Sequence, residues 1–223
     1  MFTRKELTRE KLIPCHIVSR TIGGLNIFDE QDNCLRFILQ IYAANLGKPG
    51  LNLHRQNISQ AAFDLLEGKD PSSELVKIEH SPLVNIISFA LIKDHVHFIL
   101  SGNEDNGISK FLNKLNLGFA KYFNIKNQRL GALFAKPFKI ARILGDTQLN
   151  SIVWYINIKS PLEINQDFQE YKFSSFLDLF GQRQSKIIIP KLDIKHWGIS
   201  LEKIEKQSAK IDLNEAIFLE KNQ

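Results

Sequence analysis

Apolar residues recur along this chain with two different periods, which separate its strands from its helices. Runs of β-branched and other apolar residues extend from Ile13 to Val18, from Val76 to Ile78 and from Leu83 to Ile92, and this composition is typical of strands. After Lys93 and Asp94, the run continues from His95 to Leu100. The pattern therefore predicts either two paired strands joined by a tight corner at residues 93–94, or one long bent strand.

Helices are predicted where apolar residues recur every three or four positions. The first begins at Asp32, a suitable cap, and ends before the breaker at 47–50; the second covers residues 108 to about 124. The third extends from Asp146 to Ile158 and should end at Ser160-Pro161, because proline disfavours helical backbone before it. A short helix is also predicted around 59–66, and a strand, broken by Pro137, within 133–143.

The order strand, helix, strand, strand, helix, strand predicts an α+β fold with a ferredoxin-like antiparallel sheet and helices packed on one face. The length of 223 residues suits one domain with an appendage. We expect this domain to comprise residues 1–181, followed by a partly helical C-terminal extension, 182–223, in which Trp197 is a candidate anchor.

Composition indicates the cellular compartment of the protein. No stretch approaches the roughly 20 apolar residues that would span a bilayer, and the charged residues at the start lack the apolar region of a secretion signal. We therefore expect a cytoplasmic protein with no membrane partner. Cys15 and Cys34 form neither a close pair nor a metal-binding pattern, so we interpret both as buried thiols.

The net charge of +5 is unevenly distributed, because residues 106–145 contain no Asp or Glu. Eight basic residues lie in this segment: Lys110, Lys114, Lys121, Lys126, Arg129, Lys136, Lys139 and Arg142. Such a segment favours contact with a phosphate backbone, and the aromatic residues within it, Tyr122, Phe123, Phe134 and Phe138, suit base stacking. The alternative is a solvated face that happens to be basic.

His95 and His97 are two positions apart on a predicted strand, so both imidazoles should project from the same face of the sheet and converge on one ion. Val96, Phe98 and Leu100 would then point into the core. A histidine pair of this kind has a second interpretation, in which the two rings form hydrogen bonds and bind no metal.

Tyr155 lies in the third predicted helix but outside its apolar stripe. At about 100° per residue it falls on a polar flank with Gln148, Ser151 and Lys159, where its phenol would be accessible to a ligand. Tyr122, by contrast, continues an apolar stripe, which indicates a core or base-stacking residue.

Several motifs, in this order, resemble the single-tyrosine HUH transposases, and within them the REP-associated tyrosine transposases. The resemblance covers about residues 12 to 181. Its motifs are Ile27-Phe28-Asp29, Ile92 to Leu100 with the His-x-His pair, Tyr122-Phe123-Asn124, Gly131-Ala132-Leu133-Phe134, Pro137-Phe138-Lys139, Tyr155 to Pro161, and Phe173-Ser174-Ser175.

The resemblance implies a DNA transposase, an endonuclease and ligase of single-stranded or hairpin DNA. His95 and His97 would hold Mg²⁺ or Mn²⁺ against the scissile phosphate, and Tyr155 would attack phosphorus to give a 5′-phosphotyrosine link and a free 3′-hydroxyl. The basic segment 106–145, together with Lys159, would bind the DNA.

Two positions depart from the family pattern. Lys159 replaces an Asn or Gln that serves as a third metal ligand, and an ammonium group has no lone pair for a metal, so Asn157 or water would have to substitute. Asp94 replaces an Asn and offers a carboxylate. Three hypotheses remain: an active transposase, a DNA or RNA hairpin-binding protein that has lost cleavage, and a metal-dependent phosphoesterase of small molecules.

Overall fold

A computed structural model describes residues 13–47, 51–188 and 202. Its elements are β1 (Cys15–Arg20), η1 (Ile22–Gly24), α2 (Gln31–Leu46), α3 (Ile58–Leu66), β2 (Val84–Ile92), β3 (His95–Gly102), α4 (Gly107–Lys126), β4 (Lys139–Arg142), α5 (Asp146–Trp154), the π-helical turn η2 (Tyr155–Lys159), α6 (Ser160–Glu163) and α7 (Phe176–Leu179). Most of the predicted strands and helices are present within a few residues of their expected ends.

The four strands form one antiparallel sheet in the order β2-β3-β1-β4, which confirms the predicted α+β class and the ferredoxin-like order. β2 and β3 are two separate strands joined by a tight turn at Lys93 and Asp94. Val76 to Ile78 forms no strand, and only an isolated bridge joins Ile78 to Gly47. That run is too short to compete with the long β2 for a place in the sheet.

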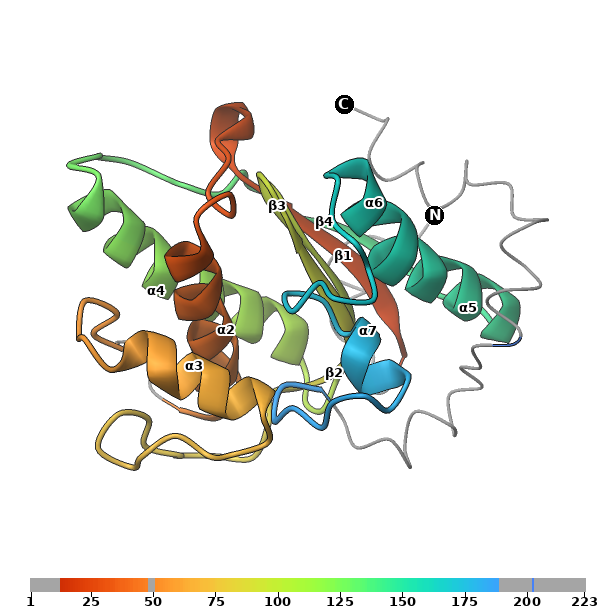
Figure 1. Ribbon diagram of the computed structural model, residues 1–223, viewed down its shortest axis with the longest axis horizontal. Coiled ribbons are helices and arrows are strands. Elements are labelled where there is room, and N and C mark those ends of the chain that lie inside the picture. Colours follow the sequence, from red (N-terminus) through yellow and green to blue (C-terminus); the bar gives the residue numbers. More distant parts are fainter. Residues whose placement is uncertain (1–12, 48–50, 189–201, 203–223) are drawn as a thin grey trace.

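Helices cover both faces of the sheet, whereas the sequence predicted helices on one face (Figure 1). One core contains α2, α3 and α4 together with Ile17, Val96, Phe98 and Leu100. The other contains α5 and η2 with Ile99 and Ala90. The strand order alone could not reveal the second layer, because α5 follows the last strand and is free to pack on either face.

Smaller expectations about the chain also have clear outcomes. Cys15 and Cys34 are buried thiols, as predicted, and burial together with the charge of Asp29 raises the pKa of Cys34 to about 12. Helix α6 continues past Pro161, where the sequence predicted the end of the helix. The backbone hydrogen bonds before the proline are already π-helical, because the Ser160 amide donates to the Tyr155 carbonyl five residues earlier. None of the described helices is both long and apolar enough to cross a bilayer.

Residues 182–188, at the start of the predicted extension, pack against the domain. Arg183 bonds to the Asp178 carboxylate and to the carbonyls of Lys172 and Ser174, and Ile187 is buried in the larger core. Trp197 lies outside the described residues.

Candidate metal and tyrosine site

His95 and His97 lie side by side on the face of β3 that is turned toward α5 and η2. Their Nε2 atoms are 2.9 Å apart, and His97 is fully buried. Two nitrogens bound at right angles to one ion, each at about 2.1 Å, would be about 3 Å apart. The observed spacing therefore fits two ligands of one divalent ion, as well as a direct hydrogen bond between the rings.

Each of the two rings is also held at its other nitrogen. His95 Nδ1 is 2.6 Å from the Asp94 carboxylate, and His97 Nδ1 is 3.1 Å from Nε2 of His16, a fully buried residue of β1 that stacks on the His97 ring. A partner at Nδ1 fixes the tautomer and the orientation that leave Nε2 for a metal. His16 is a site residue that the sequence analysis missed, because its proximity to His97 depends on the pairing of β1 with β3.

Asp94 supports the site indirectly. One of its oxygens contacts His95, and the other accepts a hydrogen bond from Arg20 at 3.3 Å. Burial of Asp94 favours the neutral acid, but the hydrogen bond to His95 and the charges of His95 and Arg20 outweigh burial, so the pKa of Asp94 is lowered. The carboxylate predicted as a possible metal ligand thus holds the candidate ligand His95 at its Nδ1 in this structure.

Tyr155 lies at the junction of α5 and η2, and its ring meets the edge of His97 at 5.5 Å between centroids and 89° between planes. The prediction that Tyr155 is accessible on a polar flank of its helix is wrong, since Tyr155 is only 1% exposed. That flank of the helix faces the histidines of β3, a contact that no periodicity along the helix could reveal.

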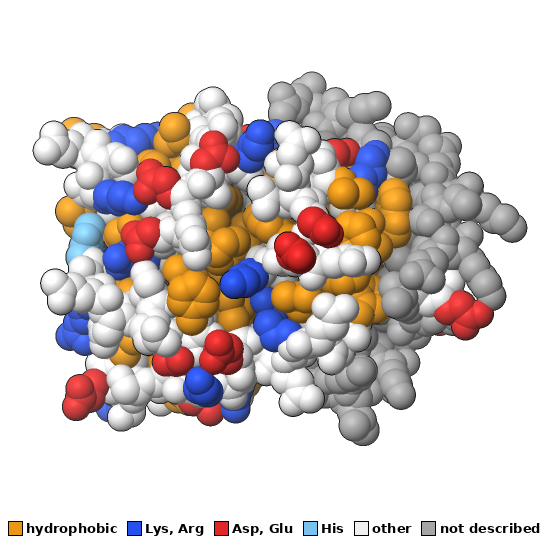
Figure 2. Space-filling view, viewed as in Figure 1, with side chains coloured by type: hydrophobic (Ala, Val, Ile, Leu, Met, Phe, Trp, Pro, Cys, Tyr) orange, Lys and Arg blue, Asp and Glu red, His pale blue; other side chains and the backbone are white. Residues whose placement is uncertain are grey.

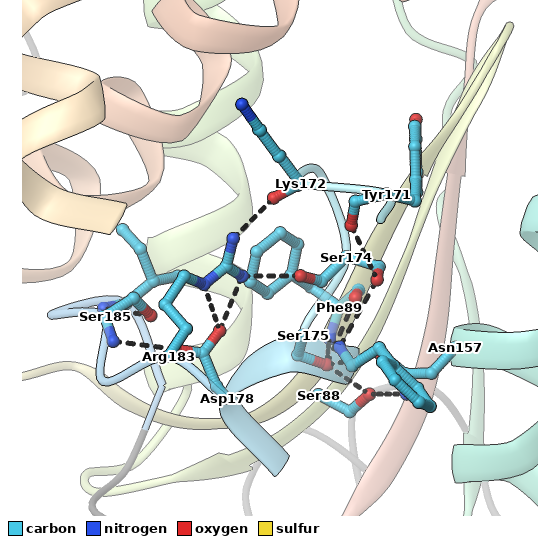
Figure 3. Close-up of polar contacts among 12 residues, drawn as sticks. Ser88, Phe89, Asn157, Tyr171, Lys172, Ser174, Ser175, Asp178, Arg183 and Ser185 are labelled. Carbon is cyan, nitrogen blue, oxygen red and sulfur yellow. Dashed lines mark hydrogen bonds and ion pairs between the residues drawn. The ribbon is translucent and has the colours of Figure 1, made fainter. Parts of the chain in front are cut away.

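Asn157 and Lys159 follow Tyr155 on the π turn but differ in their surroundings. The Asn157 amide donates to Ser88 Oγ and the Val153 carbonyl and accepts from Ser175 Oγ. Its polar groups therefore contact β2 and the serine segment, residues 173–175 (Figure 3). This arrangement does not support Asn157 as a third ligand. Lys159 lies over the Tyr155 ring at 5.8 Å and within 3.6 Å of Glu163.

Among the described residues, no group of three or more His, Cys, Asp or Glu side chains is arranged to hold a metal ion. His95 and His97 are thus two converging candidate ligands. A hard cation such as Mg²⁺ commonly takes few protein ligands and completes its shell with water and phosphate oxygens. The pair therefore fits an ion that would share its coordination with a bound phosphate.

The predicted DNA-binding residues do not form one surface. Lys110, Lys114, Lys121 and Lys126 lie on α4, in the layer opposite α5 and η2. Several basic groups already have partners within the protein. Lys110 pairs with Glu104, Lys126 with Glu30, Lys114 bonds to the Gly47 carbonyl and His80, and Arg129 to Asn124 and the Ala132 carbonyl. On the face in Figure 2, basic and acidic side chains are interspersed. A charge summed along the sequence misses acids that the fold brings alongside.

Three of the predicted basic residues lie closer to the site. Lys139 is on β4 opposite Val18, on the histidine face of the sheet, and Lys136 is exposed shortly before it. Lys159 lies beside Tyr155. Arg142 is partly buried at the end of β4, opposite Cys15, on the other face.

Known proteins resemble this chain in sequence and in fold. Residues 69–159, which include both histidines and Tyr155, match the model of the family described as IS200-like transposases. The structure of a REP-associated tyrosine transposase bound to a REP hairpin is similar, with a TM-score of 0.52 and 14% sequence identity over 82% of this chain and 86% of that one. No curated protein matches the sequence. The resemblance expected from the motifs is therefore confirmed: residues 69–159 match the IS200-like transposases, and the chain shares the fold of a REP-associated tyrosine transposase.

Proposed function

We propose that this chain is a transposase that cuts and rejoins single-stranded or hairpin DNA, with Tyr155 as nucleophile and a divalent ion, Mg²⁺ or Mn²⁺, at His95 and His97. The observation that carries the proposal is the contact between Tyr155 and His97, because it brings the candidate nucleophile next to the candidate metal ligands. The hairpin bound by the structurally similar transposase supports hairpin DNA as the partner.

The chemistry proposed for these residues is a reversible transesterification. The Tyr155 oxygen attacks phosphorus, the bond to the 3′ oxygen breaks, the phenol loses its proton to water, and the leaving oxygen gains one as a free 3′-hydroxyl. A bound divalent ion would polarise the phosphate and stabilise the charge that develops on it. Lys159 would add a positive charge beside Tyr155, which favours both the phenolate and the nearby phosphate.

The protein's own residues would position these groups. Asp94 and His16 fix the two imidazole rings, while the bonds of Asn157 to Ser88 and Ser175 tie η2 to β2. Since Tyr155 is buried in this structure, its neighbours must move before DNA reaches the hydroxyl. A π turn at this point suits such a rearrangement, because its hydrogen bonds are less regular than those of an α-helix.

The test is a covalent trapping experiment with labelled hairpin oligonucleotides taken from the DNA that flanks the gene. With Mn²⁺, the wild-type protein should give an adduct that survives denaturation and is absent after addition of EDTA. Tyr155→Phe should abolish the adduct, and the control Tyr122→Phe, in the opposite layer, should retain it. An adduct that persists in Tyr155→Phe would refute the assignment of the nucleophile.

A second candidate is a hairpin-binding protein without cleavage. It is favoured by the burial of Tyr155 and by Lys159, which stands where the resembled family has an amide ligand. Tight binding of the same oligonucleotides with no adduct in Mg²⁺, Mn²⁺ or Co²⁺ would establish this function in place of the transposase.

A further inference from the structure

A groove lies beside the histidines where the pairing of β1 with the segment before β4 is interrupted. Residues 15–18 of β1 pair with β4, and the backbone of 20–22 bonds again to Leu133 and Ala135. Residues 136–138 lie between these two paired stretches and bulge out of the sheet. The groove lies between Pro137 and Phe138 of this bulge on one side and Arg20 with the η1 turn on the other.

The groove opens on the same face of the sheet as the candidate metal ligands. Val18 and Arg20 line it, and they are the register partners of His97 and His95. Asp94 belongs to both sites, because its carboxylate contacts His95 at 2.6 Å and Arg20 at 3.3 Å. A molecule in the groove would therefore lie next to any phosphate bound at the histidines.

The lining combines apolar walls with cationic edges. Val18, Ile22, Pro137 and Phe138 supply apolar surface, and Phe138 is half-buried. The η1 turn contributes two glycines with positive φ, and a Cβ placed on Gly23 would meet no atom within 4 Å, so beyond Ile22 this wall carries no side chain that would fill the space.

The charges of the groove complement a phosphodiester. Arg20 and Lys139 line the groove and Lys136 is the first residue of the bulge. Among the described residues that line the groove, the one acid is Asp94, which pairs with Arg20. A flat apolar base with an attached anion matches apolar walls with a cationic edge, as in proteins that bind single strands by stacking and backbone contacts.

We propose that this groove binds the nucleotide adjoining the phosphate that is held at His95 and His97. The base contacts Pro137 and Phe138, and the backbone phosphate contacts Lys139. The inference rests on the proposed action on single-stranded DNA. It adds the path that the strand takes as it leaves the histidines. It makes the bulge 136–138 part of the DNA-binding surface, whereas α4 in the opposite layer is not.

The first test measures binding of a fluorescent single-stranded oligonucleotide by anisotropy. Phe138→Leu keeps apolar volume but removes the aromatic face, and we expect it to weaken binding at least about fivefold, the lower end of the effect of losing one stacked base. Phe63→Leu on α3 is the matched control, because Phe63 and Phe138 are both partly buried against the same core. The control should bind within twofold of wild type.

The second test locates the DNA directly. Oligonucleotides carrying 5-iododeoxyuridine at each position in turn are irradiated with the wild-type protein, and the crosslinked peptide is identified by mass spectrometry. Crosslinks within residues 133–139 are expected. Equal binding by Phe138→Leu and Phe63→Leu, or crosslinks confined to α4, would overturn this inference while leaving the transposase proposal intact. Absence of any DNA binding by wild type would instead overturn the proposed function.

Discussion

At the scale of single residues, the candidate site is a chain of polar contacts that joins strands β1 and β3 through the turn residue Asp94. Arg20 bonds to Asp94, Asp94 to His95, His95 to His97, and His97 to His16. Both metal-ligand candidates are thereby held at Nδ1 and present Nε2. Orienting groups of this kind typically change metal affinity by 10-fold to 100-fold when removed.

His16 provides the sharpest test of this arrangement. His16→Phe keeps a ring stacked on His97 but removes the acceptor for its Nδ1, and we expect Mn²⁺ to bind about 10-fold more weakly in titration calorimetry. The thermal midpoint of the metal-free protein serves as a second readout, because a general loss of structure would lower it.

His54→Gln, at an exposed position on the other side of the sheet, is the control and should leave Mn²⁺ affinity unchanged. His16→Gln restores an acceptor and should recover part of the affinity. If His16→Phe binds Mn²⁺ like wild type, His16 has no role in positioning His97.

The sequence predicted the position of a side chain where that position depends on neighbouring residues along the chain. The convergence of His95 and His97 follows from strand alternation, and the burial of Val96, Phe98 and Leu100 on the opposite face confirms that reasoning. The roles of His16 and the burial of Tyr155 depend on contacts between distant segments, so no spacing along the chain contains them.

At the scale of elements, the π turn η2 is fixed to the edge strand β2 by a buried polar network. Asn157 bonds to Ser88 and Ser175, and Ser175 also bonds to the backbone of Phe89 (Figure 3). The serine segment further pairs with β2 through Ser174 and Ala90. This network begins two residues after Tyr155 and therefore determines how the tyrosine is presented.

Removal of the Asn157 side chain should cost stability as well as activity. Asn157→Ala leaves the two serine hydroxyls without their amide partner in a buried site, and we expect a loss of about 1–3 kcal/mol in the free energy of unfolding. Urea denaturation measures it.

Asn113→Ala, at an exposed position of α4, is the matched control and should change stability by less than about 0.5 kcal/mol. Equal midpoints for the two variants would show that the network contributes nothing measurable. The Asn157→Ala variant should also form less covalent adduct with DNA, because loss of these hydrogen bonds would leave Tyr155 without its fixed position.

Element boundaries were predictable where periodicity was long and strong. β2, β3 and α4 match their expected ranges closely, because each buries a continuous row of side chains. The π turn was not predictable, since it arises from the bonds of Asn157 and Ser160 with neighbouring groups. The motif Phe173-Ser174-Ser175 indicated a family resemblance, and the structure adds its physical reason in the bonds to β2 and Asn157.

At the scale of the molecule, the sheet separates two helical layers with different roles. The layer of α2, α3 and α4 contains the larger core, and the layer of α5 and η2 holds Tyr155 against the histidines. The acid-free segment 106–145 runs from α4 in one layer to β4 in the sheet, so its basic residues are divided between these two places. Only the part near β4 adjoins the candidate site.

This division predicts which lysines bind DNA. Lys126 lies on α4 and is paired with Glu30, whereas Lys139 lines the groove beside Arg20. Lys139→Gln should weaken binding of single-stranded DNA and reduce the slope of log affinity against log salt by about 0.7, the loss of one released counterion. Lys126→Gln should leave that slope unchanged, because its charge is already neutralised within the protein. If the two variants lower the slope equally, DNA binding depends on the total charge of the chain. The assignment of DNA binding to the β4 side of the molecule, and not to α4, would then be wrong.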